Sequence, residues 1–321
     1  MYLQNSVWHS GQESELCIYK RADMNYHLLG KSSLTISEIG FGCMSLGDND
    51  AGNARLIHSA IEGGINYFDT ADMYQKGLNE TTVGKALQGK RDKVILATKV
   101  GNQWRPDGSG WEWNPYKHYI ISAVELSLKR LNTDYIDLYQ LHGGTIGDPI
   151  DETIEAFESL QAAGKIRYYG ISSIRPNVIS EYVRRSHVAS VMMQYSVLDR
   201  RPEETCFPLL QANDIAVLAR GSLAGGMLVN KPAKTYLNYT EDEVYKAQSA
   251  VQAISGMNRN PSQTAIRFAL QQQPVTAAIV GIRTMEQLND IITATHTPLL
   301  TDNEMIYLCA SIPVNYYEQH R

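Results

Sequence analysis

The chain has 321 residues and a formal net charge of −5, with 43% hydrophobic and 20% charged residues. This is a globular composition, and the length suits a single (β/α)₈ barrel. The acidic balance disfavours a nucleic-acid partner, and no apolar run is long enough to span a membrane. The four cysteines are widely spaced without a Cys-x-x-Cys pair. They predict no metal site, no disulfide framework and a reducing, cytoplasmic compartment.

The first 23 residues differ from the rest of the chain. They show no apolar period and lack the apolar core of a signal peptide. We expect residues 1–23 to be a disordered extension and residues 24–321 to form one domain.

After Met24, short strand-like segments rich in Ile, Val, Leu and Tyr alternate with amphipathic stretches. The predicted strands are Ile39–Met44, Asn66–Thr70, Val94–Val100, Ile136–His142, Tyr168–Ser172, Ser190–Tyr195, Ala216–Arg220 and Ala277–Gly281. Several are continuously apolar, which is typical of parallel strands buried on both faces. About eight repeats favour a closed α/β barrel, a (β/α)₈ TIM barrel, over an open sheet. Gly40 and Gly42 lack the spacing of a dinucleotide-binding Rossmann loop.

Three of the amphipathic stretches carry helix signals. Tyr119–Leu131 has an apolar side, Asp151–Ala163 has Asp151 as a candidate N-cap, and Asn260-Pro261 places proline in a first helical turn. The apolar positions expected to face inward are Ile120, Ala123, Val124, Leu126, Leu128 and Leu131 in the first stretch, and Ile154, Phe157 and Leu160 in the second.

Four polar residues stand at the ends of predicted strands: Asp69, Tyr74, Lys99 and His142. In a barrel these ends meet on one face, where the chemistry takes place. Hydride reduction of a carbonyl builds negative charge on oxygen, and Tyr74 is the candidate proton donor. Lys99 can stabilise the phenolate and Asp69 can hold Lys99 charged, while His142 can orient the carbonyl. Each residue alone more often has a structural role, but the four together favour catalysis.

The order and context of these four residues resemble the catalytic tetrad of the aldo-keto reductases, specifically bacterial-type NADP-dependent members. The resemblance covers nearly everything after Met24 and implies carbonyl reduction with a nicotinamide cofactor on a barrel. Gly170-Ile171-Ser172-Ser173 resembles the family's Gly-Val-Ser-Asn, which implies that Ser172 and Ser173 hold the nicotinamide carboxamide. Met192 stands where the family has Gln, so Gln194 is the candidate for that contact.

Two further segments resemble the family's cofactor site. Residues 217–226 are similar to its Tyr-Ser-Pro-Leu-x-x-Gly loop, with Arg220 in place of the stacking aromatic, and residues 280–290 are similar to its adenosine-binding segment. Arg283 is the candidate partner of a 2′-phosphate, so NADP(H) is expected over NAD(H); Ile291 replaces a common adenine-binding Asn. The other cofactor residues implied by the resemblance are Gly221, Leu223, Gly225, Gly281, Gln287 and Asp290.

The sequence indicates less about the substrate than about the cofactor. Met44 and the tryptophans Trp104, Trp111 and Trp113 are candidates for an apolar pocket wall, although the tryptophans could equally pack their loop onto the barrel. We expect a small carbonyl substrate and a monomer or weak homo-oligomer. Two other functions stay open. One is a cofactor-binding regulatory or redox-sensor subunit with little turnover; the other is a barrel glycosidase, which needs a second acid that does not stand out.

Overall fold

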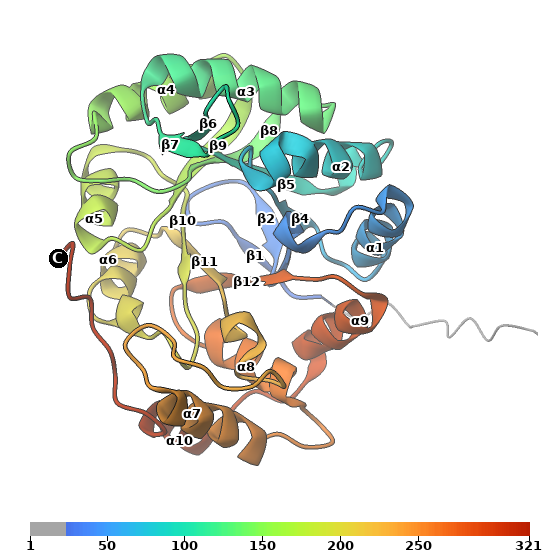
Figure 1. Ribbon diagram of the computed structural model, residues 1–321, viewed down its shortest axis with the longest axis vertical. Helices are drawn as coiled ribbons and strands as arrows, with labels where there is room; N and C mark the ends of the chain where they lie inside the picture. The colour runs from blue at the N-terminus through green and yellow to red at the C-terminus, as the bar shows by residue number, and fades with distance from the viewer. Residues whose placement is uncertain (1–23) are drawn as a thin grey trace, which may run out of the picture.

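A computed structural model describes residues 24–321, in which eight parallel strands close into a barrel (Figure 1). Around the barrel the strands follow the order β10-β11-β12-β3-β4-β5-β8-β9. Their bounds are β3 Ile39–Gly42, β4 Tyr67–Asp69, β5 Ile95–Val100, β8 Ile136–Leu141, β9 Ile166–Ser172, β10 Ser190–Gln194, β11 Ala216–Arg220 and β12 Val275–Gly281. The predicted (β/α)₈ fold is therefore confirmed. The expected extension, residues 1–23, lies outside the described residues.

Every predicted strand corresponds to one barrel strand, with differences at the ends. The first predicted strand is too long, because Cys43–Ser45 forms a 3₁₀ helix, η1, as soon as the chain leaves the barrel. Strands β9 and β12 each begin two residues earlier than predicted, at Ile166 and Val275. The apolar content thus located the strands, and the backbone pairing set their ends.

The barrel interior is filled by side chains from alternate strand positions, and a hairpin closes one end. The hairpin strands β1 (Tyr26–Leu28) and β2 (Thr35–Ser37) are antiparallel. The interior core consists of Leu29, Leu34, Ile36, Tyr67, Ala97, Leu138, Ala189, Met192, Ala216, Leu218, Ala277 and Ile279. Small residues are required where strands crowd this core: a Cβ on Gly170 would lie 2.7 Å from the carbonyl oxygen of Ser190. The hairpin plugs the end opposite the polar residues.

Helices surround the barrel on its outside (Figure 1). In the described residues they are α1 Asp50–Glu62, α2 Leu78–Ala86, α3 Lys117–Leu131, α4 Ile150–Ala162, α5 Pro176–Arg185, α6 Cys206–Ala212, α7 Glu241–Ala253, α8 Pro261–Leu270, α9 Met285–Thr293 and α10 Asp302–Ala310. Most bury an apolar face against the strands, whereas α10 packs on α7. Phe157 of α4, for example, stacks on Tyr169 with ring centroids 5.5 Å apart. Within residues 24–321 no helix is long and apolar enough to cross a membrane.

The helix predictions need two corrections. Leu126 of α3 is exposed, because it lies on the solvent side of a helix whose other predicted apolar positions are buried. Asp151 is not the N-cap of α4, which begins at Ile150 after Pro149; it lies exposed in the first turn and pairs with Arg185. The cap of α8 is as predicted: Asn260 accepts a hydrogen bond from the backbone of Gln263, and Pro261 is the first helical residue.

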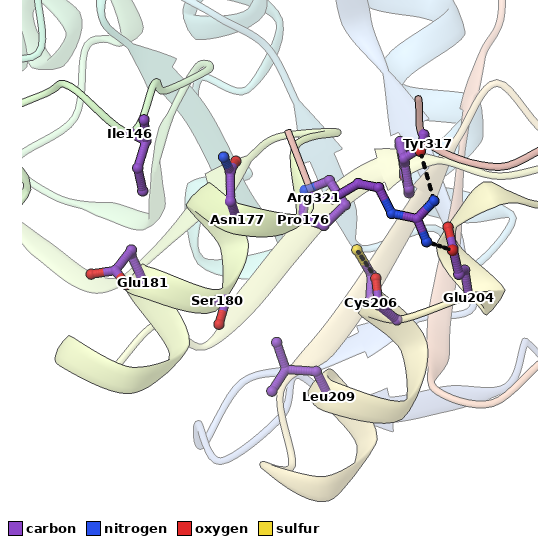
Figure 2. Close-up of a pocket in the computed structure, with 11 residues that line it drawn as sticks. Ile146, Pro176, Asn177, Ser180, Glu181, Glu204, Cys206, Leu209, Tyr317 and Arg321 are labelled. Atoms are coloured by element: carbon purple, nitrogen blue, oxygen red, sulfur yellow. Dashed lines mark hydrogen bonds and ion pairs between the residues drawn. The ribbon is translucent and has the colours of Figure 1, made fainter. Parts of the chain in front are cut away.

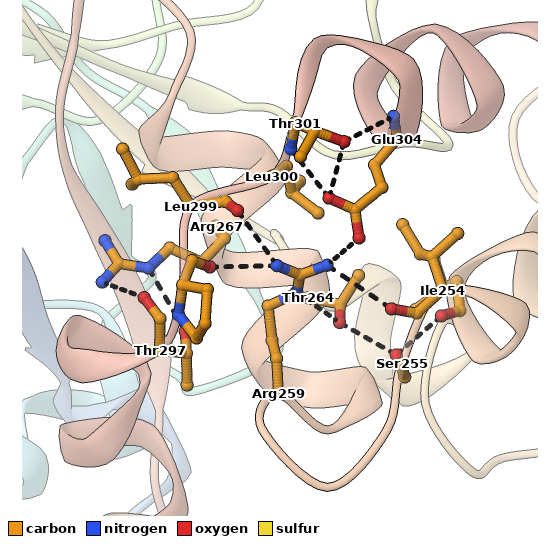
Figure 3. A network of polar contacts seen from close by, with 12 residues as sticks. Ile254, Ser255, Arg259, Thr264, Arg267, Thr297, Leu299, Leu300, Thr301 and Glu304 are labelled. Atoms are coloured by element: carbon orange, nitrogen blue, oxygen red, sulfur yellow. Dashed lines mark hydrogen bonds and ion pairs between the residues drawn. The ribbon is translucent and has the colours of Figure 1, made fainter.

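A buried arginine fastens the last helices to one another (Figure 3). Arg259, just before α8, pairs with Glu304 of α10 and donates to the carbonyl oxygens of Pro298 (3.0 Å) and Leu299 (3.2 Å). It also donates to the hydroxyl of Thr264 at 3.3 Å. Because these bonds satisfy most of the guanidinium, its charge is tolerated at 6% exposure. The network fixes α8, which in turn positions α9 at the corner expected to bind adenosine.

Candidate active site

The four predicted catalytic residues come together at the carboxyl end of the barrel. Asp69 ends β4, Lys99 is the penultimate residue of β5, and His142 follows β8 directly. Tyr74 begins the 3₁₀ helix η2 (Tyr74–Gly77), which follows β4. Because β4, β5 and β8 are neighbours, residues distant in sequence are adjacent here.

Lys99 is the centre of this group. Its ammonium forms an ion pair with Oδ1 of Asp69, donates to the carbonyl oxygen of Thr70 at 2.8 Å, and lies 3.3 Å from the hydroxyl of Tyr74. Lys99 and Asp69 are 1% and 4% exposed. Burial lowers the pKa of Lys99, but the facing carboxylate outweighs it and raises the pKa above its ordinary value. Lys99 is therefore a buried cation directed at the phenol.

Tyr74 is held at the mouth of the barrel by an unusual turn. The next residues, Gln75 and Lys76, have φ of 50° and 55°, and Gly77 has φ of 87°, so the chain passes through three left-handed positions. Such a run is unfavourable for side chains with a Cβ and is maintained only by its surroundings. The ring of Tyr74 meets His142 edge to face, with centroids 5.8 Å apart.

His142 is a neutral imidazole in this setting. Burial, with Lys99 and Arg220 nearby, lowers its pKa to about 3. Its backbone N–H is bonded to the carbonyl oxygen of Val100 at 2.7 Å, whereas its Nδ1 is buried without a partner among residues 24–321. A neutral imidazole has one N–H donor, which suits binding of a carbonyl oxygen without supplying a mobile proton.

The predicted carboxamide contacts lie on the neighbouring strands β9, β10 and β11. Ser172 and Ser173 are buried, and Ser173 Oγ accepts from the backbone of Arg175 at 3.2 Å. Met192 is 2% exposed within the barrel core, whereas Gln194 is half-buried with its amide 3.4 Å from the hydroxyl of Tyr236. The side-chain amide of Gln194 thus lies at the barrel mouth, whereas the side chain of Met192 lies in the barrel core.

The predicted pyrophosphate loop follows β11. Arg220 ends that strand, next to Gln194 in register, and its positive charge acts on both Asp69 and His142. Gly221 and Gly225 have φ of 74° and 66°, which only glycine adopts readily, and they enclose Leu223, which precedes the 3₁₀ helix η5 (Ala224–Gly226). The loop is therefore compact and presents backbone at its surface.

At the predicted adenosine corner Gly281 ends β12 and the exposed Arg283 precedes α9. The backbone N–H of Arg283 donates to Oε1 of Gln287 at 2.9 Å. Asp290 accepts from Gln263 at 3.3 Å and from Asn260, which the sequence did not predict. Gln287 and Asp290 thus already have structural partners, and the guanidinium of Arg283 is an exposed cation of this corner, with the exposed Glu286 nearby in sequence.

The predicted substrate residues divide into exposed and packed positions. Met44 and Trp111 are 66% and 49% exposed. Trp104 and Trp113 belong to a hairpin of β6 (Asn102–Trp104) and β7 (Trp111–Trp113), and both are half-buried. The indole of Trp104 donates to the carbonyl oxygen of Met73 (3.1 Å) and that of Trp113 to Asp148 (3.0 Å). Trp104 and Trp113 therefore fasten the hairpin to the barrel, which is the packing role expected for them, and the pocket wall stays a prediction.

Sequence reasoning missed two polar side chains of the site, Gln140 and Tyr236. Gln140 of β8 donates to Oδ2 of Asp69 at 3.2 Å, and Tyr236 reaches Gln194 from the long segment between β11 and α7. A signal for Gln140 exists, because it stands two residues before His142 on a strand and shares its face. Tyr236 comes from an irregular segment, and no periodicity predicts where it lies.

Comparison with known proteins agrees with this geometry. The model of the aldo/keto reductase family matches residues 38–312. The chain belongs to the aldo/keto reductase family. It is 48% identical to the uncharacterized oxidoreductase YqkF of Bacillus subtilis over 93% of this chain and 100% of that one. Aldo-keto reductase AKR11C1 from Bacillus halodurans, in its holo form, has a TM-score of 0.88 at 49% identity, covering 93% of this chain and 99% of that one. Its apo form has a TM-score of 0.80 at 47% identity, with the same coverage.

Membership of the aldo/keto reductases makes this chain a nicotinamide-dependent oxidoreductase acting on carbonyl or alcohol groups. The family membership leaves no reason to consider a glycosidase. In other enzymes of this fold, the carboxyl end of the barrel, where these polar residues lie, carries the active site.

A separate cavity lies outside the barrel between α5 and α6 (Figure 2). Its volume is about 480 Å³, and the chain end covers it where Arg321 pairs with Glu204. The residues that line it are Ile146, Pro176, Asn177, Ser180, Glu181, Glu204, Thr205, Cys206, Leu209, Tyr317 and Arg321. It contains none of the four catalytic candidates and is therefore separate from the candidate active site.

We expect Asp72, between Asp69 and Tyr74, to make the stability of the fold depend on pH. Burial, together with the charge of Glu80, raises its pKa to about 8, and its Oδ2 contacts the hydroxyl of Tyr119 at 3.4 Å. Between the unfolded and folded pKa values the native state holds the proton and the unfolded state does not. Unfolding free energy therefore falls with rising pH from about 4 to 8, by at most ~1.4 kcal/mol per unit.

We expect Asp72→Asn to remove this dependence. Urea unfolding at pH 6 and pH 8 should show the variant gaining stability relative to wild type at the higher pH. Asp134→Asn, at an exposed position, is the control and should track wild type at both values. Parallel curves for Asp72→Asn and wild type would contradict a protonated Asp72.

Proposed function

We propose that this chain reduces aldehydes or ketones to alcohols with NADPH, Tyr74 acting as general acid. The observation that carries the proposal is the 3.3 Å contact between the Tyr74 hydroxyl and the Lys99 ammonium, itself paired with buried Asp69. A phenol beside a fixed cation is a proton donor whose conjugate base is stabilised as it forms. The same groups serve the reverse reaction, because an acid in one direction is the base in the other.

The donors around the site fit a nicotinamide nucleotide. Ser172 and Gln194 offer a hydroxyl and an amide for a carboxamide, and Arg220 offers a planar cation that stacks on flat rings. The glycine loop after β11 suits a pyrophosphate. When bound, the reduced nicotinamide supplies a hydride to the carbonyl carbon.

The side chains of this protein then have separate tasks. The N–H of neutral His142 binds and orients the carbonyl oxygen, and Tyr74 gives that oxygen its proton. Lys99 keeps the resulting phenolate stable, and Asp69 keeps Lys99 charged and in place. The hairpin of β6 and β7 supplies an apolar wall beside the reacting carbonyl.

The choice of NADPH over NADH rests on Arg283. The two cofactors differ by the 2′-phosphate, and the exposed guanidinium of Arg283 stands at the corner where adenosine is expected. Arginine can meet phosphate with two parallel hydrogen bonds, and we take the whole exposed contact as worth about 1.5–3 kcal/mol, the range for one charge-assisted hydrogen bond. Asp290 is half-buried and bonded to Gln263, so it competes little for this position.

We expect Arg283→Ala to weaken NADPH binding by roughly ten- to a hundred-fold and NADH binding much less. Fluorescence titration of both cofactors measures this, and added salt should narrow the gap between them. Arg184→Ala, a surface arginine on α5, is the control. Equal losses for both cofactors would mean that Arg283 only supports the loop.

We propose a small carbonyl compound as substrate, with the protein acting as a monomer or weak homo-oligomer. A screen of NADPH oxidation against aldehydes, ketones and sugars tests the reaction and finds the substrate class. Tight NADPH binding without turnover of any of them would instead support the regulatory or redox-sensor role.

A further inference from the structure

Gln140 lies next to Asp69 and Lys99, the buried ion pair of the proposed site. It is fully buried in the barrel on β8 and lies opposite Lys99 in the register of β5 and β8. Its Nε2 donates to Oδ2 of Asp69 at 3.2 Å, while Lys99 takes Oδ1 of the same carboxylate. Because an ionised carboxylate only accepts hydrogen bonds, the amide must present its nitrogen to Asp69.

The other end of this amide is left without a partner. Oε1 of Gln140 is buried and forms no hydrogen bond with the described residues. A buried carbonyl oxygen without a partner is destabilising, and an apolar side chain of similar size would avoid that cost. Packing therefore does not explain a glutamine here, whereas the bond to Asp69 does.

We propose that Gln140 is a positioning residue for the reaction, acting through Asp69 on Lys99 and Tyr74. By holding Oδ2, it fixes the rotation of the carboxylate so that Oδ1 faces Lys99. Its N–H also favours the ionised form of Asp69, which keeps Lys99 an ammonium next to the phenol. This inference rests on the proposed reductase reaction and adds a fifth residue to its proton-handling set.

Several other charged or titratable groups act on this set, and none replaces the bond from Gln140. They are Cys43 and Tyr67, whose ionised forms Asp69 disfavours, together with Tyr74, His142 and Arg220. Arg220 also favours ionised Asp69, so the loss of Gln140 should weaken the pair rather than abolish it.

The test is Gln140→Met in the full chain, with Ser190→Ala as control. Methionine keeps the length and volume but donates no hydrogen bond. Ser190 is also buried in the barrel, its hydroxyl has no partner in the described residues, and it lies outside the proposed site. We expect kcat to fall about tenfold in Gln140→Met, with NADPH affinity within about twofold of wild type. Ser190→Ala should keep wild-type kcat.

The pH profile separates positioning from a structural role. Without Gln140 the ionised form of Asp69 is less favoured, so Lys99 stabilises the phenolate less. The alkaline limb of the plot of kcat against pH should therefore move to higher pH by about half a unit or more. A melting temperature near that of wild type should accompany this shift. Normal wild-type turnover with an unshifted profile in Gln140→Met would overturn the inference alone. Absence of turnover in wild type would overturn the proposed function instead.

Discussion

Replacing Tyr74 by phenylalanine is expected to lower kcat for carbonyl reduction by roughly two to four orders of magnitude. The substitution removes only the hydroxyl that lies 3.3 Å from Lys99. The ring and its edge-to-face contact with His142 remain, so NADPH affinity and melting temperature should stay close to wild type. Steady-state kinetics with the best aldehyde from the screen, together with a cofactor titration, measure both halves of this expectation.

Tyr245→Phe is the matched control, because this tyrosine is 61% exposed on α7, outside the proposed site. It should leave every parameter unchanged. A kcat for Tyr74→Phe within a few-fold of wild type would remove Tyr74 from the mechanism.

The second large effect concerns the buried ion pair of Asp69 and Lys99. Lys99→Met should lower kcat by at least about a hundred-fold, because the phenolate of Tyr74 loses its cation. It should also destabilise the fold by about 3–5 kcal/mol at neutral pH, because Asp69 is left as an uncompensated buried charge. Burial raises the pKa of Asp69, and the charge of Lys99 opposes that shift. The pKa of Asp69 should therefore be higher still in Lys99→Met. A raised folded pKa means that stability falls as pH rises, and the deficit should shrink in mild acid.

Urea unfolding at several pH values measures the deficit. The double variant Asp69→Leu/Lys99→Met removes both charges and should recover part of the lost stability without recovering turnover. Lys76→Met controls for the loss of a cation near Tyr74, because Lys76 is an exposed lysine two residues after Tyr74 in η2. Equal stability of Lys99→Met and wild type at all pH values would show that Asp69 does not carry a charge.

The fold was predictable because its signals are local and repeated. Each barrel strand is a short apolar run between polar turns, and Asn260-Pro261 carries a complete helix start in consecutive residues. The proximity of the four catalytic candidates was predictable for a different reason. Parallel strands bring their carboxyl ends to one face, so Asp69, Lys99 and His142 had to lie near one another. Tyr74 differs from the prediction, because it lies beyond the strand end in η2, which returns it to the same face.

What the sequence could not predict depends on partners distant in the chain. Gln140 looks like an ordinary strand residue until β4 and β8 place it against Asp69. Asp290 was assigned to the cofactor, yet its bonds run to Asn260 and Gln263 at the start of α8. The partners of Gln140 and Asp290 are set by tertiary contacts, not by local preference. The start of α4 was mispredicted for a local reason: Asp151 has the residue type of a cap, but Pro149 already fixes where the chain turns.

Turnover by the wild-type chain is the most direct test of the proposed reductase activity. Purified protein is mixed with NADPH and a panel of aldehydes and ketones, and oxidation of the cofactor is followed together with formation of the alcohol. We expect stoichiometric NADPH loss and alcohol gain with at least one carbonyl compound, and loss of that activity in Tyr74→Phe. NADPH binding with no alcohol formed from any of these compounds, or equal rates for wild type and Tyr74→Phe, would contradict it.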